Sequence, residues 1–347
     1  MKKVRVGIFG AGSIAQKRHI RETAENPNVE LVAVCDIVKE RAEQVAKQYG
    51  MKAYEDYKEL LAKENIDAVI VCTPNYLHAP MSIYSLKAGK HVLCEKPMAI
   101  SSLEAEEMIR TAKENGKFLM IGHNQRLMKP HVKAKEILES GKLGKILTFR
   151  TTFGHGGPES WSVAQSLKTW FFKKEEAFVG AMGDLGVHKA DLIRWLIGEE
   201  ISEVAAFVST LDKKYDNGQL INVDDNATCI LKTKSGIIGS LIASWTYKGG
   251  EDNGTIIYCE KGVLKIGYDP EFQVIVNYKD DTRDCYNVGG ISTNLKQLNS
   301  GVSDLFIDCI LNGREPEISG DEGLKALNII LACLESQEKS TVAKVKQ

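Results

Sequence analysis

The sequence has almost no net charge and lacks the features of several protein classes. Its 45 Lys and Arg residues nearly cancel its 46 Asp and Glu residues, so no overall field attracts a nucleic acid backbone or an anionic membrane. No apolar run approaches the roughly 20 residues needed to span a bilayer. The chain starts directly on a strand-like segment, without the apolar core of a secretion signal. We therefore expect a cytoplasmic protein with a small-molecule partner.

Cysteine is present, but not in a pattern that binds metal or forms disulfides. The eight cysteines are scattered, with no Cys-x-x-Cys pair and no Cys/His spacing of the kind that ligates zinc. Cys35, Cys72 and Cys94 each lie near the end of an apolar run, where a free thiol packs as a small hydrophobic group in a reducing compartment. We predict neither a metal site nor a disulfide.

Two domains are expected, because 347 residues with 43% apolar side chains exceed what one hydrophobic core usually organises. Residues 1–123 alternate short apolar runs with amphipathic stretches, which is typical of a doubly wound α/β domain. After that, alternating polarity and turns such as Lys234-Ser235-Gly236 favour antiparallel hairpins. The sequence thus predicts an α+β domain over 124–347 with a mostly antiparallel sheet. We expect a last helix at about 322–339 to pack back on the first domain.

A glycine-rich turn follows the first strand, Val4–Phe9, and opens a helix. In this Gly-x-Gly-x-x-Ala motif, Gly10 permits a tight turn, Gly12 lets the backbone approach a diphosphate, and Ala15 keeps helix and strand close. The helix N-terminus favours the negative charge of the diphosphate. The predicted cofactor contacts of this turn are Gly10, Gly12, Ser13, Ile14 and Ala15. The motif alone is weak, but its place in the first βαβ unit favours dinucleotide binding.

Asp36 ends the second predicted strand, where a carboxylate can accept hydrogen bonds from the adenosine ribose and repel a 2′-phosphate. The next residues are Ile37 and Val38, so no arginine stands immediately beside Asp36. NAD is therefore favoured over NADP, although Lys39 and Arg41 keep NADP open. Asp36 as the cap of the following helix is compatible with the same placement.

Two further motifs carry candidate catalytic groups. Glu95-Lys96-Pro97 follows a predicted strand, and its ammonium can hydrogen-bond a substrate hydroxyl. Asp184 and His188, four residues apart, share one face of a predicted helix, so the carboxylate can steer the imidazole or both can reach one hydroxyl. Taken singly, Lys96 can instead be a surface charge, Asp184 a helix cap, and His188 a core or surface histidine.

In combination, these motifs resemble the Gfo/Idh/MocA oxidoreductase family, which includes glucose-fructose oxidoreductases and inositol dehydrogenases. The resemblance covers essentially the whole chain, and it implies a Rossmann domain followed by a large, open antiparallel sheet that commonly forms homodimers or homotetramers. It also implies hydride transfer between NAD and a secondary hydroxyl of a sugar or cyclitol. The matching positions, in order, are Gly10–Ala15, Asp36, Thr73-Pro74-Asn75, Glu95-Lys96-Pro97, Asn124 with Arg126, and 183–192.

The resemblance also implies roles for individual residues. Lys96, Asp184 and His188 line the active site of the family: our hypothesis is that His188 takes the hydroxyl proton, Lys96 polarises that oxygen and Asp184 orients the imidazole or the substrate. The Lys96–Pro97 bond is expected to be cis. Further expected cofactor contacts are Thr73, Pro74, Asn75, His78, Glu95, Lys96, Asn124 and Arg126. His155 and Trp161 are candidates for the substrate pocket, and Trp170, Trp245 and Tyr247 can either stack on a sugar or pack in the core.

Two other functions stay open at this point. One is an NAD-dependent glycosidase that oxidises and re-reduces its sugar within one cycle, although such relatives tend to carry an export signal and a different motif around the histidine. The other is a non-catalytic, NAD-binding regulator. The joint presence of Lys96, Asp184 and His188 argues against a regulator, since a sensor does not need them.

Overall fold

The structure is a computed structural model that describes residues 3–163, 166–292 and 298–347. By their internal contacts the residues form two compact units: 1–124, 161–163 and 299–324 in the first, and 125–160, 164–298 and 325–347 in the second. The sequence alone assigns 161–163 and 299–324 to the second domain. They group with the first unit because they bond to it; for example, the Ile121 N–H donates to the Ile318 carbonyl at 2.9 Å.

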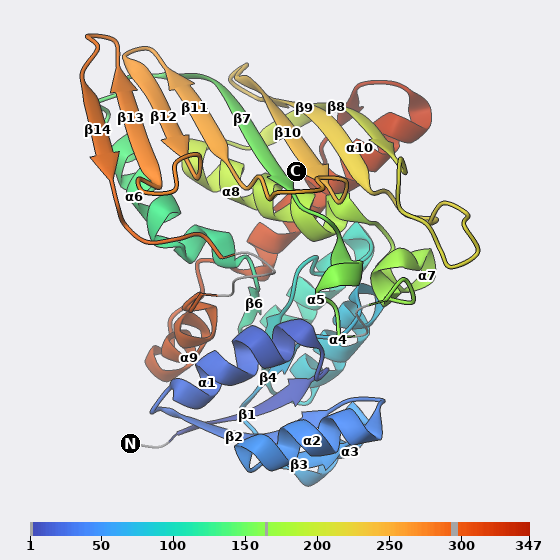
Figure 1. The fold of residues 1–347 in the computed structure, drawn as a ribbon. Helices are drawn as coiled ribbons and strands as arrows, with labels where there is room; N and C mark the ends of the chain where they lie inside the picture. The colour runs from blue at the N-terminus through green and yellow to red at the C-terminus, as the bar shows by residue number, and fades with distance from the viewer. Residues whose placement is uncertain (1–2, 164–165, 293–297) are drawn as a thin grey trace. The chain divides into compact units, whose positions relative to one another are not determined.

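The first unit is built on a six-stranded parallel sheet in the order β3-β2-β1-β4-β5-β6. Its strands are β1 Val4–Phe9, β2 Val29–Cys35, β3 Lys52–Tyr54, β4 Ala68–Val71, β5 His91–Cys94 and β6 Leu119–Ile121. Its helices are α1 Ile20–Glu25, α2 Lys39–Tyr49, α3 Tyr57–Lys63, α4 His78–Lys87, α5 Ser102–Glu114 and α9 Val302–Asn312. Figure 1 shows helices on both faces of this sheet. The doubly wound fold predicted for this part of the chain is confirmed.

Burial on both faces explains the sequence of these strands. All four residues of β4 are buried, as expected for a central parallel strand. Helix α2 buries Ala42, Val45 and Ala46 on one face and ends at Gly50, whose positive φ of 68° suits glycine. The short edge strand β3 has two exposed residues out of three and was not predicted, because it carries no apolar run.

The second unit contains a nine-stranded sheet in the order β14-β13-β12-β11-β7-β10-β9-β8-β15. Its strands are β7 Ile146–Gly154, β8 Ile201–Ser209, β9 Asn226–Thr233, β10 Ile238–Ser244, β11 Thr255–Cys259, β12 Gly262–Ile266, β13 Val274–Tyr278, β14 Arg283–Tyr286 and β15 Ala343–Lys344. The β9–β10 and β11–β12 hairpins lie at the turns that the sequence indicates. The pair β7–β10 is parallel and the remaining paired strands are antiparallel. The mostly antiparallel sheet is thus confirmed.

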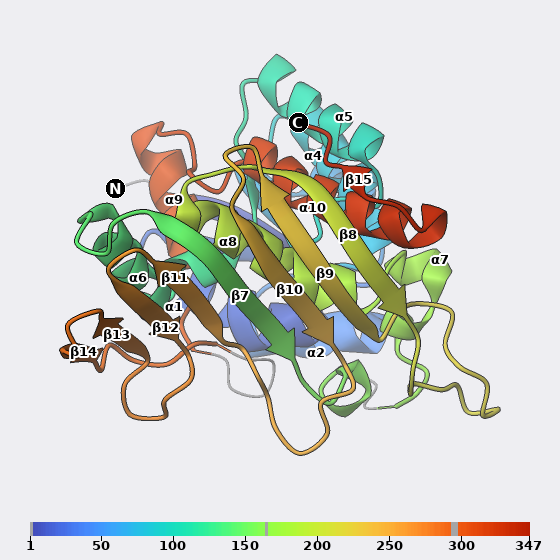
Figure 2. The same ribbon diagram turned by 90° about the horizontal axis from the view of Figure 1, so that it is seen from above.

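Helices cover one face of this sheet. The helices of the second unit are α6 Lys129–Glu139, α7 Lys174–Ala177, α8 Val187–Ile197 and α10 Gly320–Lys339. The first five residues of α10, 320–324, belong to the first unit. Figure 2 shows α6, α8 and α10 behind the strands, and within the described chain no helix lies over the face turned to the viewer. Strand β9 alternates accordingly, with Ala227, Cys229 and Leu231 buried and Thr228, Ile230 and Lys232 exposed.

Two helix starts are wider than predicted. Residues Ala15–His19, before α1, and Met182–Gly186, before α8, form π-helical turns, whereas the sequence predicts ordinary helix at both places. Close packing accompanies the second turn: a Cβ on Gly183 would lie 2.2 Å from Val179, and one on Gly186 would lie 2.6 Å from the Met182 sulfur. Such turns are rare and frequently mark functional sites.

No helix in the described part of the chain combines the length and the apolar character needed to cross a membrane. Across residues 3–163, 166–292 and 298–347, no group of three or more His, Cys, Asp or Glu side chains is arranged to hold a metal ion.

Candidate active site

The glycine turn has the geometry that a diphosphate requires. Gly10 has a φ of +86°, and a Cβ there would lie 2.7 Å from the Cys72 carbonyl oxygen, so glycine is required. A Cβ on Gly12 would meet nothing within 4 Å, which leaves open space beside that backbone. Ala15 is fully buried under the turn. These residues therefore fit the diphosphate of a dinucleotide at the carboxyl edge of the sheet.

Two buried polar side chains at the same edge have no hydrogen-bond partner among the described residues. They are the Thr73 hydroxyl, beyond the end of β4, and the Asn124 amide, beyond the end of β6. Buried polar atoms are normally satisfied, so such groups indicate a missing ligand or water. Both residues were predicted as cofactor contacts, and their positions fit that prediction.

Both carboxylate oxygens of Asp36 accept hydrogen bonds from residues of the first unit. Its Oδ2 accepts from the Ala11 N–H at 2.8 Å, and its Oδ1 accepts from the Val38 N–H at 2.9 Å. Arg41 donates from Nε to Oδ2 at 2.9 Å and from Nη2 to Oδ1 at 2.6 Å. Asp36 thus ties the glycine turn to the start of α2, where Val38 rather than Asp36 is the cap residue.

The loop that carries Lys96 is fixed by a buried charge cluster. Glu95 accepts from His19 Nε2 at 2.7 Å, from the Arg18 guanidinium at 3.4 Å and from the Lys96 N–H at 3.1 Å. Burial alone would raise the pKa of Glu95, but the His19 hydrogen bond and the neighbouring positive charges outweigh it and hold this pKa well below its usual value. Lys96 is partly buried, and the Lys96–Pro97 bond is cis, as the resemblance implies.

The His78 side chain connects two loops at this edge of the sheet. Its Nδ1 lies 2.7 Å from the Pro97 carbonyl and its Nε2 lies 2.9 Å from the Thr73 carbonyl. Burial lowers the pKa of His78, with the two carbonyls acting in the opposite direction. The ring therefore joins the loop after β4 to the loop after β5, and its predicted contact with the cofactor stays a prediction. The adjacent Asn75 is buried at the start of the 3₁₀ turn Asn75–Leu77.

In the second unit, Asp184 lies within the π-helical turn and not at a helix cap. Its Oδ2 accepts from the Trp245 indole Nε1–H at 3.1 Å. Trp245 is fully buried, with Phe171 and Phe172 against its ring, so this tryptophan belongs to the core and does not present a sugar platform. The hydrogen bond fixes one oxygen of the Asp184 carboxylate.

A buried acidic pair, Asp224 and Asp225, holds the backbone around this turn. Asp224 accepts from the Gly180 and Met182 N–H groups, each at 2.7 Å, and burial raises its pKa to about 6. A Cβ on Gly180 would lie 1.8 Å from the Asp224 carbonyl, so only glycine allows this approach. The Asp225 carbonyl accepts from the Trp245 N–H at 2.7 Å. The pair thereby positions both Asp184 and its indole partner.

Asp225 and Lys213 also anchor the loop that follows β7. The Asp225 carboxylate accepts from the Leu211, Asp212 and Lys213 N–H groups, each at 2.8 Å. Lys213, itself buried, donates to the Gly156 carbonyl at 2.5 Å and pairs with Glu159. The substrate candidate His155 precedes this anchor and accepts from the Gly157 N–H at 3.0 Å.

His188 occupies the first turn of α8, where it is buried. The Phe153 ring is near two histidines: its centroid is 6.0 Å from that of His188 and 5.9 Å from that of His155. Within the second unit, the structure therefore places His155 and His188 around one aromatic ring.

Comparison with known proteins decides the family. Residues 4–123 match the model of the "Oxidoreductase family, NAD-binding Rossmann fold", and residues 131–265 match the "GFO/IDH/MocA C-terminal domain". The chain belongs to the Gfo/Idh/MocA family. The resemblance that its motifs indicate is thus confirmed, and its first unit carries the NAD-binding fold of this family.

Several sugar and cyclitol dehydrogenases are similar to the chain over most of its length. Myo-inositol 2-dehydrogenase of Thermotoga maritima is 27% identical over 99% of both chains. Glucose-6-phosphate 3-dehydrogenase of Bacillus subtilis is 32% identical over 70% of this chain and 68% of its own. A solved levoglucosan dehydrogenase with NADH and levoglucosan has a TM-score of 0.86 and 25% identity over the full length of both chains.

Two other predicted contacts of this Gfo/Idh/MocA chain have partners within their own units. Arg126, in the 3₁₀ turn Asn124–Leu127, forms a buried two-point ion pair with Asp191 of α8, at 2.8 and 2.6 Å. The Trp161 carbonyl accepts from the Ser13 hydroxyl at 3.1 Å, which brings Trp161 to the cofactor helix of the first unit. The contacts of both residues with cofactor or substrate stay predictions.

Sequence reasoning missed the residues that hold the candidate groups. Arg18 and His19 support the Lys96 loop, and Asp224 and Asp225 support the Asp184 turn, yet none was singled out. The available signals were weak: Asp224-Asp225 is an acidic pair just before an alternating strand, and His19 lies one helical turn beyond the glycine motif. Their partners are far away in sequence, so the pattern around each residue does not disclose its role.

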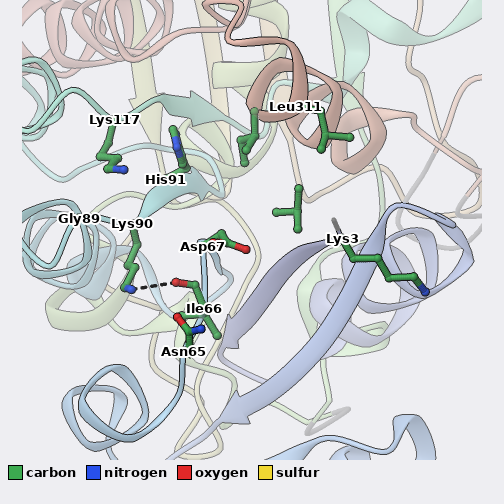
Figure 3. Close-up of a pocket in the computed structure, with 11 residues that line it drawn as sticks. Lys3, Asn65, Ile66, Asp67, Gly89, Lys90, His91, Lys117 and Leu311 are labelled. Carbon is green, nitrogen blue, oxygen red and sulfur yellow. Dashed lines mark hydrogen bonds between the residues drawn. The ribbon is translucent and has the colours of Figure 1, made fainter. Parts of the chain in front are cut away.

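One cavity lies at the opposite edge of the first sheet. It measures about 380 Å³ and includes Asp67, Lys90, His91 and Lys117, near the amino ends of β4 and β5 (Figure 3). Lys90 donates to the Ile66 carbonyl at 2.8 Å, and His91 accepts from the Phe118 N–H at 3.0 Å. Ligands of doubly wound folds bind at the carboxyl edge. We therefore expect the cofactor at the edge of Gly10 and Lys96 and not in this cavity.

Proposed function

We propose that the chain is an NAD-dependent dehydrogenase that oxidises a secondary hydroxyl of a sugar or cyclitol to a ketone. The first unit binds NAD, and the second supplies substrate contacts and the subunit interface. The observation that carries the proposal is the carboxyl edge of the first sheet, where the open Gly12 turn, the unsatisfied Thr73 and Asn124, and Lys96 occur together. The named relatives support the substrate class.

The candidate catalytic residues have different proposed roles. Lys96 donates a hydrogen bond to the substrate oxygen and stabilises the charge that develops on it. His188 accepts the hydroxyl proton, and Asp184, held by Trp245, orients the imidazole or a neighbouring substrate hydroxyl. NAD, when bound, supplies the acceptor for the hydride of the carbinol carbon. One proton and one hydride thus leave the substrate, which becomes a ketone.

A substrate panel tests this proposal. The purified chain is mixed with NAD and, separately, with cyclitols, anhydrosugars and sugar phosphates, the classes that the names of these relatives represent, and with free aldoses and chromogenic glycosides. Absorbance of reduced nicotinamide and release of the aglycone from the glycosides are both followed. We expect net NADH with at least one free sugar or cyclitol. Glycoside cleavage without net NADH would instead show the glycosidase, and NAD binding without turnover on the whole panel would show a regulator.

We further propose that the uncovered face of the nine-stranded sheet joins copies of this chain into a homodimer or homotetramer. Phe207, Ile230 and Ile238 project from this face, with exposed fractions of 80%, 47% and 50%. The strand register places them on the same side, because Phe207 pairs with Thr228 and Ile230 with Ser240. Exposed apolar patches of this kind typically mark subunit interfaces.

Light scattering coupled to size exclusion tests the interface. The wild type is expected to elute as a dimer or tetramer, and Ile230→Lys to shift it towards the monomer. Leu103→Lys is the matched control, since Leu103 is 75% exposed on α5 of the first unit. A monomeric wild type, or an Ile230→Lys variant that assembles normally, would contradict this assignment.

We also place the enzyme in the cytoplasm. All eight cysteines are unpaired thiols, and seven of them are buried, which suits a reducing compartment. Fractionation of cells that express a tagged chain checks the assignment, and recovery outside the cytoplasmic fraction would contradict it.

A further inference from the structure

Lys189, on α8 of the second unit, carries a buried amino group without a carboxylate partner. Its side chain is fully buried, and its Nζ donates to the Asn253 backbone carbonyl at 3.3 Å. In the part of the chain that the structure describes, Lys189 forms no ion pair. Lysine is almost never fully buried unless it is paired, because a buried charge is costly without a counter-charge. The hydride transfer proposed above does not use this amino group.

Polar side chains near Lys189 also lack partners. Among the described residues, both polar atoms of the Asn253 amide are buried without a hydrogen bond, and so is Nε2 of His131 on α6. His131 Nδ1 lies 2.7 Å from the Gln125 carbonyl, so Nδ1 carries the ring proton and Nε2 is an acceptor. Burial, followed by the charge of Lys189, lowers the pKa of His131 to about 3. Buried polar atoms are normally satisfied, so this group of side chains indicates a missing ligand or water.

This group of side chains lies close to the candidate base. Lys189 Nζ is 5.8 Å from the centre of the Phe153 ring, and the His188 ring centre is 6.0 Å from the same point. His188 and Lys189 are also adjacent in the first turn of α8. These separations are comparable to the span of one sugar with its substituents. A sugar that presents a hydroxyl to His188 can therefore bring a second group towards Lys189.

The unused donors and acceptors fit an acidic sugar. A lysine ammonium has three N–H donors, of which Lys189 uses one, and the Asn253 amide offers two more, which suits an anionic group. The Asn253 amide oxygen and His131 Nε2 accept, which suits hydroxyls beside that group. We propose that Lys189 and Asn253 bind an anionic substituent, a carboxylate or a phosphate, of the sugar substrate. The inference rests on the proposed dehydrogenase function and narrows its substrate class.

Two matched series of sugars test the inference by turnover. Glucose, glucuronate and glucose 6-phosphate differ at one carbon, as do galactose, galacturonate and galactose 6-phosphate. With NAD present, we expect one acidic member to exceed its neutral counterpart in kcat/KM by about tenfold or more, as a hydrogen bond to a charged group allows. The acidic member that is preferred distinguishes carboxylate from phosphate. In Lys189→Met the ratio of acidic to neutral sugar should fall to near one.

Lys248→Met is the matched control. Lys248 belongs to the same β10–β11 connection as Asn253, but it is exposed and pairs with Asp212 at the surface. Its replacement should keep the wild-type ratio of acidic to neutral sugar. Asn253→Ala is a second test variant, which removes the amide and keeps the backbone carbonyl that Lys189 contacts. We expect it to lower the ratio by about fivefold or more.

Calorimetry adds a measurement that does not depend on turnover. Burial lowers the pKa of Lys189 to about 7, opposed by Asp252 and Glu251, and the neighbouring His131 is neutral. A bound anion raises the pKa of Lys189, so the complex takes up a proton at pH 8. The six sugars are titrated into the NAD-saturated chain in HEPES and in Tris, whose heats of ionisation differ. We expect an uptake close to one proton with the acidic sugar, none with its neutral counterpart, and none in Lys189→Met.

The outcomes separate this inference from the proposed function. Equal turnover and binding of acidic and neutral sugars, or proton uptake that persists in Lys189→Met, would overturn the inference and show that water fills the site. Turnover of neutral sugars would in that case still support the dehydrogenase. Binding of an acidic sugar with proton uptake that depends on Lys189, but without reduction of NAD by any sugar, would instead support the anion site and contradict the proposed function.

Discussion

The two units hold their candidate carboxylates by different means. In the first unit, basic side chains bind them: Arg41 binds Asp36, while Arg18 and His19 contact Glu95. In the second unit, the Trp245 indole donates to Asp184, and backbone N–H groups of Gly180 and Met182 donate to Asp224. Cation pairing thus dominates around the cofactor edge, and neutral donors recur around the π-helical turn.

This difference has opposite consequences for titration. The pKa of Glu95 is lowered, so its contribution to stability is present above the unfolded value near 4.5 and is lost as the pH falls. Burial raises the pKa of Asp224 to about 6, so its contribution is present below the unfolded value of 3.8 and is lost as the pH rises through about 6. The Glu95 carboxylate at the cofactor edge therefore stays charged, whereas Asp224 is the more easily protonated of the two carboxyl groups.

The largest effect is expected from Lys96→Met, which removes the cation proposed to act on the substrate. Turnover should fall by about 10³-fold, while NAD affinity should stay within about threefold, because the loss concerns the reacting oxygen. Steady-state kinetics and calorimetry measure the two quantities. Lys90→Met is the matched control at the other end of β5, and its turnover should be nearly unchanged. Equal turnover of Lys96→Met and wild type would remove Lys96 from the mechanism.

Glu95→Gln tests cation pairing in the first unit. The change leaves the buried Arg18 and His19 without their carboxylate, which should cost about 3 kcal/mol of stability. Urea unfolding followed by circular dichroism reports it. In the control Glu30→Gln, the glutamate pairs with Arg5 at the surface, so the loss should be below about 1 kcal/mol. Similar losses of stability in the two variants would show that the buried ion pairs contribute no more than a surface ion pair does.

Lys189→Met tests a fully buried lysine of the second unit, whose ammonium donates to the Asn253 carbonyl at 3.3 Å. Burial lowers the pKa of this fully buried lysine to about 7, and Asp252 and Glu251 only partly oppose the shift. Because the unfolded chain binds more protons between pH 7 and 10.5, wild-type stability should rise over that range. The variant should be more stable at pH 7 by about 2 kcal/mol and should lack this rise.

Lys213→Met is the matched comparison, since Lys213 is also buried but is paired with Glu159. It should destabilise the protein, because it leaves a carboxylate without its cation. Urea titrations near neutral pH and near pH 9 distinguish the two lysines. The interpretation of Lys189 fails if its replacement destabilises the protein at neutral pH.

Trp245→Phe gives the smallest expected effect. Phenylalanine keeps an aromatic ring in the core but removes the indole N–H that binds Asp184. We expect kcat to fall about tenfold, or about 1.4 kcal/mol, with the KM for NAD unchanged. Trp195→Phe, on α8, is the control and should leave kcat near the wild-type value. A kcat for Trp245→Phe equal to that of the control would mean that the hydrogen bond does not position Asp184.

Local sequence patterns predict most of the fold, but they predict few of the residues that hold the candidate site groups in place. The alternation of β9 and the turn at 234–236 are sufficient for the β9–β10 hairpin, and the apolar run Ala68–Val71 is sufficient for a buried strand. Candidate groups such as Asp36 and Lys96 could be named because they follow strands directly. Their motifs lie within a few residues of the element that positions them.

The contacts that hold the candidate site groups join positions that are distant in the sequence. His19 and Glu95 are 76 residues apart, and Gly180 and Asp224 are 44 apart, so no local window contains either pair. The π-helical turn depends on the same distant packing, since the sequence of Met182–Gly186 alone favours no wider helix. The Asp36–Arg41 ion pair could have been predicted from the sequence, because the two residues are only five positions apart. The direction of the Arg41 side chain nevertheless required the structure.

Transfer of deuterium from substrate to cofactor is the decisive test of direct hydride transfer at a site that contains Lys96. A substrate found in the panel is labelled at the carbinol carbon, and the nicotinamide product is analysed by mass spectrometry for the wild type and Lys96→Met. We expect reduced cofactor that carries one deuterium in the wild type, with formation about 10³-fold slower in the variant. Reduced cofactor without the label, or equal rates in the two proteins, would contradict direct hydride transfer at a site that contains Lys96.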